Sequence, residues 1–524
     1  MRPKTGIFAL GLLFFSLTTV MYAQQPPFTK VFYDLSGTAQ SYSIVKTFDH
    51  NFMIAGEKDD VPMMMKVDPA GNALWIKKAE ATVPQSRFTS VIATSDSCFV
   101  FAGTVPPWYG DQVLCMKMSP AGNPLWFREY NLGMQVITSS IQETSGHGFI
   151  LTGDLKTPVA TSEVFVLKLD SAGNISWSTI LSSLTGSDFG YAVKQTPDGG
   201  YILAGETESY PPYQDGATMI KLTASGAVSW AKKQNVPAQY YSSAWDVVVT
   251  ATGLIWYLST TGNGVVLMKT DVDGNVLWSK SITATPGGVF DGTPRPKLHV
   301  TSDGGFVFLS SSQGFDQLVR TDADGNSRWG QTFWMITYDV AEADDNGYMV
   351  AGNGPIMGVK KSPTNNPQIG LVKTDSAGNS IGCESQITVT SAPCSISFTP
   401  ITFTSSSAGS ATSLNWGFTN VSLSVFEGCV PITGSVSENN EEVHAFAVSP
   451  NPASGRFLVT NTRPSGLPIL DIRVFNAFGR MVRESSVQVS DQARFDLEGQ
   501  PDGLYFVQAR YADRIYTEKI VINH

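Results

Sequence analysis

The chain has 524 residues, of which only 15% are charged, while 11% are aromatic and 48 are glycine. This length exceeds what one hydrophobic core accommodates and predicts two or three domains, and the composition favours strands over helices. The net charge of −10 argues against a nucleic-acid partner, because binding to phosphates requires a basic surface.

Residues 1–23 are typical of a secretory signal peptide. Arg2 and Lys4 precede an apolar run, and Ala23 offers a cleavage position after that run. The alternative is an uncleaved membrane anchor, for which the run is short. We therefore expect an exported protein that is secreted or attached to the outer cell surface.

A twelve-residue motif related to D-x-x-G-N-x-x-W recurs along most of the chain. Its seven copies are Lys66–Lys77, Lys117–Arg128, Lys168–Thr179, Lys221–Lys232, Lys269–Lys280, Arg320–Gln331 and Lys373–Glu384. Six copies carry a tryptophan at the same place, with spacings of 48 to 53 residues. These residues are Trp75, Trp126, Trp177, Trp230, Trp278 and Trp329. A fixed period near 50 residues indicates a repeat architecture, and one tryptophan at the same strand position in each repeat suits packing between neighbouring repeats.

Each repeat contains four apolar segments of strand length, separated by turns rich in Gly, Asp and Asn. The second segment is apolar at consecutive positions, as in Phe52–Gly56, which is typical of a strand buried on both faces. Seven four-stranded antiparallel units of this kind predict an all-β chain with a seven-bladed β-propeller at residues 24–382.

The two ends of the repeat array complement each other. The seventh copy lacks the tryptophan strand, because Ser380–Cys383 stands in its place. The segment Phe28–Tyr33 resembles a tryptophan strand, with Phe28 at the position of Trp75. We expect this segment to form the outer strand of the last blade, which closes the ring and removes an exposed edge.

Residues 383–430 are rich in Ser and Thr and contain short strand-like pieces. We expect them to form a small β extension packed on the propeller. Residues 431–443 are polar and lack aromatic side chains, which is typical of a linker.

Five cysteines are present, and export permits disulfides. Cys98 and Cys115 fall on neighbouring strands of one repeat and could pair, and one bridge is expected among Cys383, Cys394 and Cys429. No C-x-x-C motif and no Cys/His cluster is present, so we expect no metal site and no cofactor.

Residues 444–524 form a separate module with its own pattern. In order, it contains Ser449–Pro452 (SPNP), Phe478–Arg480 (FGR), Gly503–Val507 (GLYFV) and Lys519–Val521 (KIV). This module resembles the C-terminal sorting domain of proteins exported by the type IX secretion system of Bacteroidetes-type bacteria. The repeats, in turn, resemble those of exported bacterial propeller proteins.

The resemblance implies a small β-sandwich that the export machinery recognises, that a sortase removes and that is often exchanged for surface lipopolysaccharide. The residues that match the sorting signal are Pro450, Asn451, Pro452, Gly479, Gly503, Leu504, Tyr505 and Lys519. The alternative is a β adhesion domain at the same place.

The loops between the second and third strands vary in length, and function often lies on such loops. Trp108 and Tyr109 fall on one of them, and Tyr210 and Tyr213 on another. Exposed aromatic rings beside prolines suit stacking on a sugar or a peptide, so these four are the predicted ligand contacts. The alternative is that the loops shield their own blades.

Three inner strands carry charged residues at one aligned position, namely Asp246, Lys297 and Asp339. They are the candidates for an acid/base site near the loop-side mouth, and the alternative is a solvated rim of ion pairs. The turns that contain Asp271 and Asp322 lack the last carboxylate of a calcium-binding loop, which leaves them as hairpin turns.

The leading hypothesis is a secreted or cell-surface binding protein that presents a loop face to a glycan or a protein. One alternative is an enzyme acting on extracellular polysaccharide through Asp246 and Asp339. The other is a structural adhesion or surface-layer component. The type IX export machinery, a sortase and surface lipopolysaccharide are the further partners expected, with no nucleic acid among them.

Overall fold

The computed structural model describes residues 25–34, 37–80, 85–105, 112–133, 135–156, 161–183, 186–208, 215–235, 242–250, 255–261, 264–285, 297–312, 315–333, 335–354, 368–380, 384–414, 417–427, 446–462, 468–476, 481–485, 491–511 and 515–523. The chain divides into two compact units, Met1–Val430 and Pro431–His524. The described residues contain strands and no helix, so the protein is all-β as expected, and these ranges hold no helix suited to crossing a membrane. The predicted signal peptide lies outside them, as do all residues of the predicted linker.

Seven antiparallel meanders of four strands make up most of the first unit. Meander 1 contains β2 (Ala39–Lys46), β3 (Phe52–Lys58), β4 (Val61–Val67) and β5 (Ala73–Ala79). Meander 2 contains β6 (Arg87–Ala93), β7 (Phe99–Val105), β8 (Gln112–Met118) and β9 (Pro124–Asn131). Meander 3 contains β10 (Gln135–Glu143), β11 (Phe149–Lys156), β12 (Ser162–Leu169) and β13 (Ile175–Ser182). Meander 4 contains β14 (Asp188–Gln195), β15 (Tyr201–Thr207), β16 (Gly216–Leu222) and β17 (Val228–Gln234). Meander 5 contains β18 (Ser242–Val249), β19 (Ile255–Thr261), β20 (Gly264–Thr270) and β21 (Val276–Thr285). Meander 6 contains β22 (Leu298–Val300), β23 (Phe306–Ser312), β24 (Phe315–Thr321) and β25 (Ser327–Phe333). Meander 7 contains β26 (Ile336–Glu342), β27 (Tyr348–Asn353), β28 (Ile369–Lys373) and β1 (Phe28–Tyr33).

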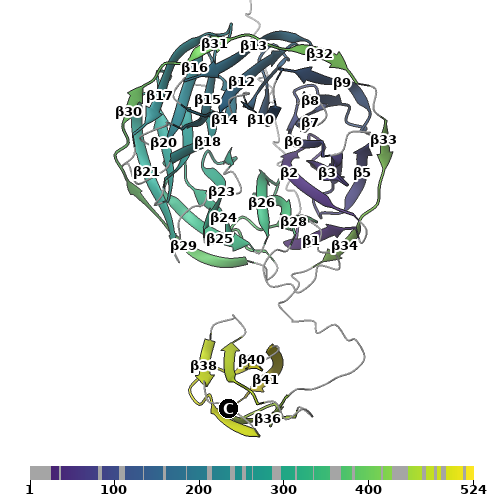
Figure 1. Ribbon diagram of the computed structural model, residues 1–524, viewed down its shortest axis with the longest axis vertical. Helices are drawn as coiled ribbons and strands as arrows, with labels where there is room; N and C mark the ends of the chain where they lie inside the picture. The colour runs from purple at the N-terminus through teal and green to yellow at the C-terminus, as the bar shows by residue number, and fades with distance from the viewer. Residues whose placement is uncertain are drawn as a thin grey trace, which may run out of the picture. The chain divides into compact units, whose positions relative to one another are not determined.

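The meanders lie around a common centre, with their first strands innermost (Figure 1). The hydrophobic core lies between neighbouring meanders, because the middle strands are buried on both faces. One cluster joins the two ends of the array, with Ile54 and Met65 of meander 1 beside Ala351 and Leu371 of meander 7.

The N-terminal strand pairs with the last repeat, as the sequence predicts. Phe28 of β1 is paired with Lys373 of β28, and Phe32 with Ile369. The expectation that β1 is the outermost strand is wrong, because β34 (Ser424–Glu427) pairs with its other edge.

Sheets of five strands replace the expected separate blades of four. Each meander gains a fifth strand from an outer belt, β29–β34, which covers 384–427. The other belt strands are β29 (Glu384–Pro393), β30 (Phe398–Pro400), β31 (Thr404–Ser406), β32 (Ser410–Ser413) and β33 (Phe418–Asn420). Because β29 pairs with both β21 and β25, meanders 5 and 6 merge into one sheet of nine strands.

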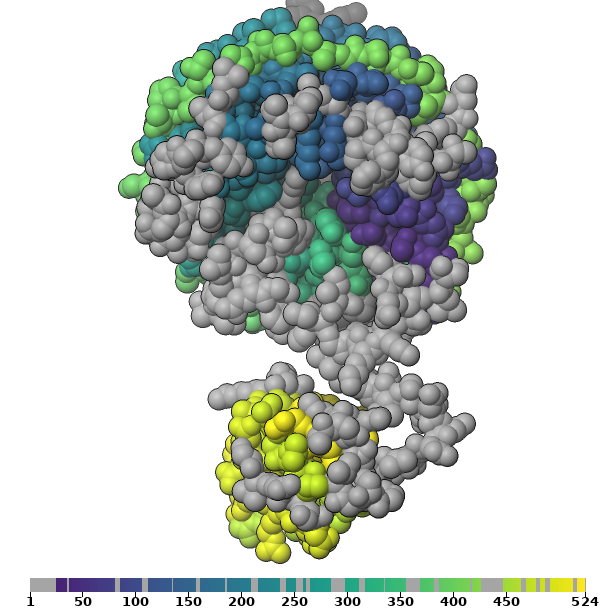
Figure 2. Space-filling view, viewed as in Figure 1, coloured from purple at the N-terminus to yellow at the C-terminus, as the bar shows by residue number. Residues whose placement is uncertain are grey.

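The belt passes the meanders in the order 6, 5, 4, 3, 2, 1, 7 and so makes a circuit of the rim (Figure 2). The expected extension packed on the rest of this unit thus takes the form of a belt of short strands. Its strands are too short to build a core, and apolar residues such as Phe398, Phe403 and Phe418 instead pack into the clusters between meanders.

An aromatic residue of each meander packs on a glycine of the next. The ring of Trp230 lies against Gly274, whose backbone has a φ of 69°, and a Cβ there would lie 2.5 Å from Trp230 Cη2. The same pairing recurs at Trp75–Gly122, Trp126–Gly173, Trp177–Gly226, Trp278–Gly325, Trp329–Gly378 and Phe28–Gly71. The predicted packing role of the tryptophans is thereby confirmed, and Phe28 completes the series.

An ion pair recurs between the turn that joins the first and second strands of a meander and its third strand. Asp198 Oδ2 lies 2.9 Å from Lys221 Nζ, and Asp96 Oδ2 lies 2.6 Å from Lys117 Nζ. Burial acts to raise the pKa of Asp198, but hydrogen bonds from Thr196 and Lys221 outweigh it and hold the pKa at about 2. Meander 3 has Gly146 at the position that Asp49, Asp96, Asp198, Asp303 and Asp345 occupy in meanders 1, 2, 4, 6 and 7.

The possible bridge between Cys98 and Cys115 is not formed: both are free and buried. Cys98 lies at the turn before β7, whereas Cys115 is paired in register with Ala102. Cys394 is also free, and Cys383 and Cys429 lie outside the described residues.

The C-terminal unit has two antiparallel sheets. One contains β35 (Phe446–Ser449), β36 (Arg456–Asn461) and β39 (Gln492–Asp496); the other contains β37 (Asp471–Asn476), β38 (Met481–Ser485), β40 (Gly503–Arg510) and β41 (Ile515–Ile522). A single cluster of buried side chains, which includes Phe457, Val474, Val507 and Ile520, connects them. This arrangement agrees with the expected β-sandwich.

We predict that Gly274→Ala destabilises the first unit by about 2–4 kcal/mol, since it combines a left-handed backbone with a collision against Trp230. The free energy of unfolding in urea measures the loss. Gly304→Ala is the matched control, because Gly304 has a φ of 82° and its nearest neighbour is 4.0 Å away. Equal losses in both variants would contradict the packing role of the tryptophan.

We predict that Gly146→Asp stabilises the protein by about 0.5–1 kcal/mol, since it supplies the missing partner of Lys168. Burial lowers the pKa of Lys168, whose Nζ now donates to Leu169 O at 2.7 Å, and the new carboxylate raises that pKa. A Cβ at Gly146 meets no atom within 4 Å. Gly146→Ala gives only the gain in backbone entropy, so equal urea midpoints for the two variants would exclude the ion pair.

Candidate functional site

Six of the seven innermost strands contain a one-residue bulge at the same place. In β2 the register with β3 shifts between Ser41 and Ser43, which leaves Tyr42 unpaired. The six residues at this position are Tyr42, Thr89, Ser139, Tyr191, Trp245 and Tyr338. A bulge redirects a side chain, so the side chains here depart from the alternation of the strand.

At five of the six bulges a glycine of the second strand lies opposite the inner strand, and meander 5 has Ser259 there. A Cβ at Gly56 would collide with the carbonyl oxygen of Gln40, and Gly103, Gly153, Gly205 and Gly352 stand in the same relation to their inner strands. In the sequence this glycine ends the apolar second segment, as in Phe52–Gly56. It is the signal that could have located the bulge.

Tyr42 and Tyr338 form the centre of a polar and aromatic cluster on meanders 7, 1 and 2. Their ring centroids are 5.3 Å apart, in an edge-to-face arrangement at 82°. The Cζ atom of Arg87 lies 5.7 Å from the centroid of the Tyr42 ring. All three side chains are half-buried, so each keeps a part exposed.

Hydrogen bonds connect these rings to polar side chains. Gln40 Oε1 accepts from Tyr42 Oη at 3.2 Å and from Asn353 Nδ2 at 3.1 Å, and Gln40 Nε2 donates to Glu57 Oε1 at 2.7 Å. Burial raises the pKa of Glu57, although the positive charge of Arg87 acts in the opposite direction. We call Gln40, Tyr42, Glu57, Arg87, Tyr338 and Asn353 the Tyr42 cluster.

The aligned carboxylates Asp246 and Asp339 belong to different junctions. Asp246 Oδ2 accepts from the backbone nitrogen of Leu298 at 3.0 Å, which joins meander 5 to meander 6. Asp339 Oδ2 accepts from Ser43 Oγ at 2.8 Å and from the nitrogen of Ile44 at 3.1 Å, which joins meander 7 to meander 1. Both side chains are buried.

Asp339 also contacts a histidine that the sequence did not indicate. Its Oδ1 atom lies 2.8 Å from His299 Nε2. Burial acts to raise the pKa of Asp339, but the hydrogen bond with His299 and the charges of His299 and Lys297 outweigh it, so the pKa lies below its ordinary value. The structure thus brings Asp339 and Lys297 together, and it shows no contact of Asp246 with either among the described residues.

A second aromatic group lies between meanders 4 and 5. The rings of Tyr191 and Trp245 are stacked with centroids 4.5 Å apart, and Phe189 stacks on Tyr191 at 6.2 Å. Glu206 accepts from Ser243 Oγ at 2.8 Å and from Tyr191 Oη at 3.1 Å. Tyr191 and Trp245 are buried, so this group packs the junction rather than presenting a ring to solvent.

The predicted ligand contacts Trp108, Tyr109, Tyr210 and Tyr213 lie outside the described residues.

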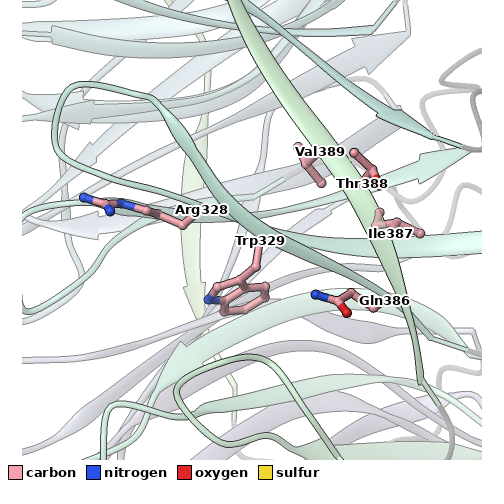
Figure 3. A pocket seen from close by; sticks show the side chains of 6 residues that line it. All are labelled: Arg328, Trp329, Gln386, Ile387, Thr388 and Val389. Atoms are coloured by element: carbon pink, nitrogen blue, oxygen red, sulfur yellow. The ribbon is translucent and has the colours of Figure 1, made fainter.

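A cavity of about 400 Å³ lies at the rim, between Trp329 and the belt residues Gln386–Val389 (Figure 3). Its lining contains no carboxylate and no histidine, so it lacks the groups for acid/base chemistry. Within the described ranges, no group of three or more His, Cys, Asp or Glu side chains could hold a metal ion.

In the C-terminal unit, Asn451 connects its segment to the last strand. Its Nδ2 atom donates to the carbonyl of Lys519 at 2.7 Å, and its Oδ1 atom accepts from the nitrogen of Val521 at 2.9 Å. Tyr505 is buried and donates to Pro501 O at 2.7 Å, whereas Leu504 is exposed. Gly479 lies outside the described residues.

We predict that Glu206→Gln stabilises the protein at pH 8 and not at pH 4.5. Burial raises the pKa of Glu206 to about 7, so the folded state favours the neutral carboxyl. The stabilisation that the folded state gains from the neutral carboxyl is complete below the ordinary pKa of glutamate. It is lost as the pH rises through 7. Urea unfolding should show a gain of ~2 kcal/mol at the higher pH, and a gain of the same size at both values would contradict this assignment.

Comparisons with known proteins identify only the C-terminal unit. Residues 447–523 match the model of the secretion system C-terminal sorting domain. No curated protein matches the chain. Among solved structures, Drosophila Plexin A in complex with Semaphorin 1b is 8% identical, with a TM-score of 0.35 over 67% of this chain and 87% of that chain.

Two further structures are similarly distant. The putative exo-beta-1,3-galactanase from Bifidobacterium bifidum s17 is 12% identical, with a TM-score of 0.27 over 48% of this chain and 89% of that chain. The V. cholerae biofilm matrix protein Bap1 is 11% identical, with a TM-score of 0.22 over 67% of this chain and 77% of that chain. Similarities at this level carry no argument about this protein.

The matched domain marks proteins that are secreted and attached to the cell surface. It implies interaction with the type IX export machinery, in agreement with the motifs at Ser449–Pro452 and Gly503–Val507. The protein is therefore exported and surface-attached by way of its C-terminal sorting domain.

Proposed function

We propose that the protein is a cell-surface glycan-binding protein whose ligand lies at the Tyr42 cluster. On this proposal the seven meanders are the blades of a seven-bladed β-propeller, and the belt adds a fifth strand to each. The observation that carries the proposal is the pair of partly exposed rings, Tyr42 and Tyr338, beside the guanidinium of Arg87.

The chemistry of this cluster suits a sugar. A tyrosine ring offers an apolar face to the C–H groups of a pyranose and a hydroxyl at its edge. Gln40 and Asn353 supply amide groups, and Arg87 supplies donors in a fixed plane. The network among Gln40, Tyr42 and Asn353 holds these groups in place before a ligand binds, which lowers the entropic cost of binding.

The cluster lies near the loop-side ends of the inner strands. The bulges occur close to the start of each strand, and β2 and β26 both enter from connections on that side. We propose that the loops that carry Trp108, Tyr109, Tyr210 and Tyr213 lie on the same side and extend the ligand surface. A protein ligand is the other outcome that the experiment below distinguishes.

We assign no catalytic step. The enzyme hypothesis requires carboxylates that face one substrate, whereas Asp246 and Asp339 are buried and bonded to separate junctions. Removal of the sorting domain by a sortase and attachment to surface lipopolysaccharide are proposals that rest on the matched domain.

We predict that the purified full chain binds at least one sugar on a glycan array, and that Tyr42→Ala combined with Tyr338→Ala weakens this binding at least tenfold, because both rings are lost. Thermal unfolding of the variant should match that of the parent. Phe48→Ala is the control, since Phe48 is an aromatic residue with 58% exposure in the turn at the opposite end of β2.

Three results are informative. Loss of binding in the tyrosine variant alone supports the proposed site. Binding that this variant retains but that Trp108→Ala with Tyr213→Ala abolishes moves the site to the loops. No binding to any sugar excludes the glycan proposal and favours a protein ligand or a structural role.

A further inference from the structure

A hydrogen bond recurs where the inner strands meet their turns, at the end opposite to the Tyr42 cluster. The last residue of an inner strand accepts from the backbone nitrogen of a turn in the preceding meander. Glu143 Oε2 accepts from Ser95 N, Gln195 Oε1 from Ser145 N and Glu342 Oε2 from Ser302 N, each at 2.7 Å. We call this contact the junction hydrogen bond.

The junction between meanders 4 and 5 lacks it, as does the junction between meanders 1 and 2, where β6 ends at Ala93. Between meanders 4 and 5 the turn residue is Pro197, which has no N–H, and the last residue of β18 is Val249, which has no acceptor. At this junction a pocket of about 370 Å³ opens, lined by Pro197, Val249, Gln142, Gln195, Thr196 and Thr250 among others. The substitution of both partners therefore removes a contact and coincides with a cavity.

Two amide groups of the lining are held with their donor ends unoccupied. Gln142 Oε1 accepts from the nitrogen of Gln195 at 2.6 Å, and Gln195 Oε1 accepts from the nitrogen of Ser145 at 2.7 Å. These bonds fix the carbonyl end of each amide. Within the part of the chain that the structure describes, neither Nε2 atom donates a hydrogen bond to another protein group, so four N–H groups remain available.

The composition of the lining also indicates the charge of the ligand that would bind there. None of its residues carries a formal charge, and Asp198 beside it is already paired with Lys221 at 2.9 Å. Pro197 and Val249 offer apolar surface, whereas the Thr196 hydroxyl already donates to Asp198 Oδ1. A volume of this size matches small-molecule pockets, which combine apolar walls with a few placed polar groups.

We propose that this pocket binds a neutral sugar unit, with the Nε2 groups of Gln142 and Gln195 as donors to its oxygens and with Pro197 and Val249 against its C–H face. The site is separate from the Tyr42 cluster and does not depend on the function proposed there. It would give the protein a second carbohydrate contact at the opposite ends of the inner strands.

The test uses the full chain carrying Tyr42→Ala and Tyr338→Ala, so that binding at the Tyr42 cluster is reduced. Saturation-transfer NMR is recorded with the methyl glycosides of glucose, galactose, mannose and N-acetylglucosamine, and with glucuronic acid and glucosamine as charged comparisons. We expect at least one neutral glycoside to bind, and the charged sugars to bind more weakly.

Two changes address the pocket without removing a natural contact. Pro197→Ser with Val249→Glu rebuilds the junction hydrogen bond on the pattern of Ser302 and Glu342, fills the pocket and should abolish the signal. Gln195→Glu keeps the acceptor, as Glu143 does at the same position, but removes the donor, and should weaken binding about tenfold. Phe48→Ser with Ala93→Glu makes the same change between meanders 1 and 2 and should leave binding intact.

Failure is equally specific. If no neutral glycoside gives a signal, if only a charged sugar binds, or if the neutral signal survives Pro197→Ser with Val249→Glu, the proposal is overturned. Thermal unfolding of each variant confirms that a lost signal reflects the pocket and not the fold.

Discussion

The ring depends on the contact between an aromatic side chain of one meander and a left-handed glycine of the next. Seven such contacts occur, and the one between Phe28 and Gly71 joins the two ends of the array. The flat ring needs a neighbour without a Cβ, and the turn needs a residue that accepts a positive φ. Glycine meets both requirements, so one residue type fixes the turn and the spacing between meanders together. Lys77 adds to this contact, because its Nζ lies over the Trp75 ring at 5.3 Å and donates to Gly122 O at 2.5 Å.

The sequence contains enough information to predict the meanders and the partner of β1. Both follow from a periodic pattern of apolar segments, turn residues and tryptophans, because packing between equivalent neighbours imposes the same demand on every repeat. The outer belt could not be predicted in this way. Its strands β30–β34 have three or four residues each and contact a different partner every time, so no period appears in 384–427. Pairing of short edge strands depends mainly on backbone groups, which every sequence supplies.

The candidate site, too, could be predicted from the sequence only in part. An alignment of inner strands correctly placed Asp246 and Asp339 at one structural position, since each follows a bulge. It did not show that the bulge exists, so the adjacent residues Tyr42 and Tyr338 were missed. A strand that alternates strictly would bury those side chains differently, and one extra residue changes which of them meet. The charged residues that looked most reactive are instead bonded to the backbone of the next meander, where a buried carboxylate can accept two N–H groups.

Departures from the repeat therefore have two different meanings in this fold. At the tryptophan position a departure is compensated, as when Phe28 of the N-terminal strand replaces the tryptophan that Ser380–Cys383 lacks. At Pro197 and Val249 no other residue restores the lost hydrogen bond, and a cavity remains. A contact that closes the ring must be preserved at all seven junctions, because a single open junction exposes two core faces. A hydrogen bond at the end of an inner strand stabilises one junction alone, so it can be absent where a pocket is present. The second kind of departure is where a repeat fold can acquire a binding site at little cost to its stability.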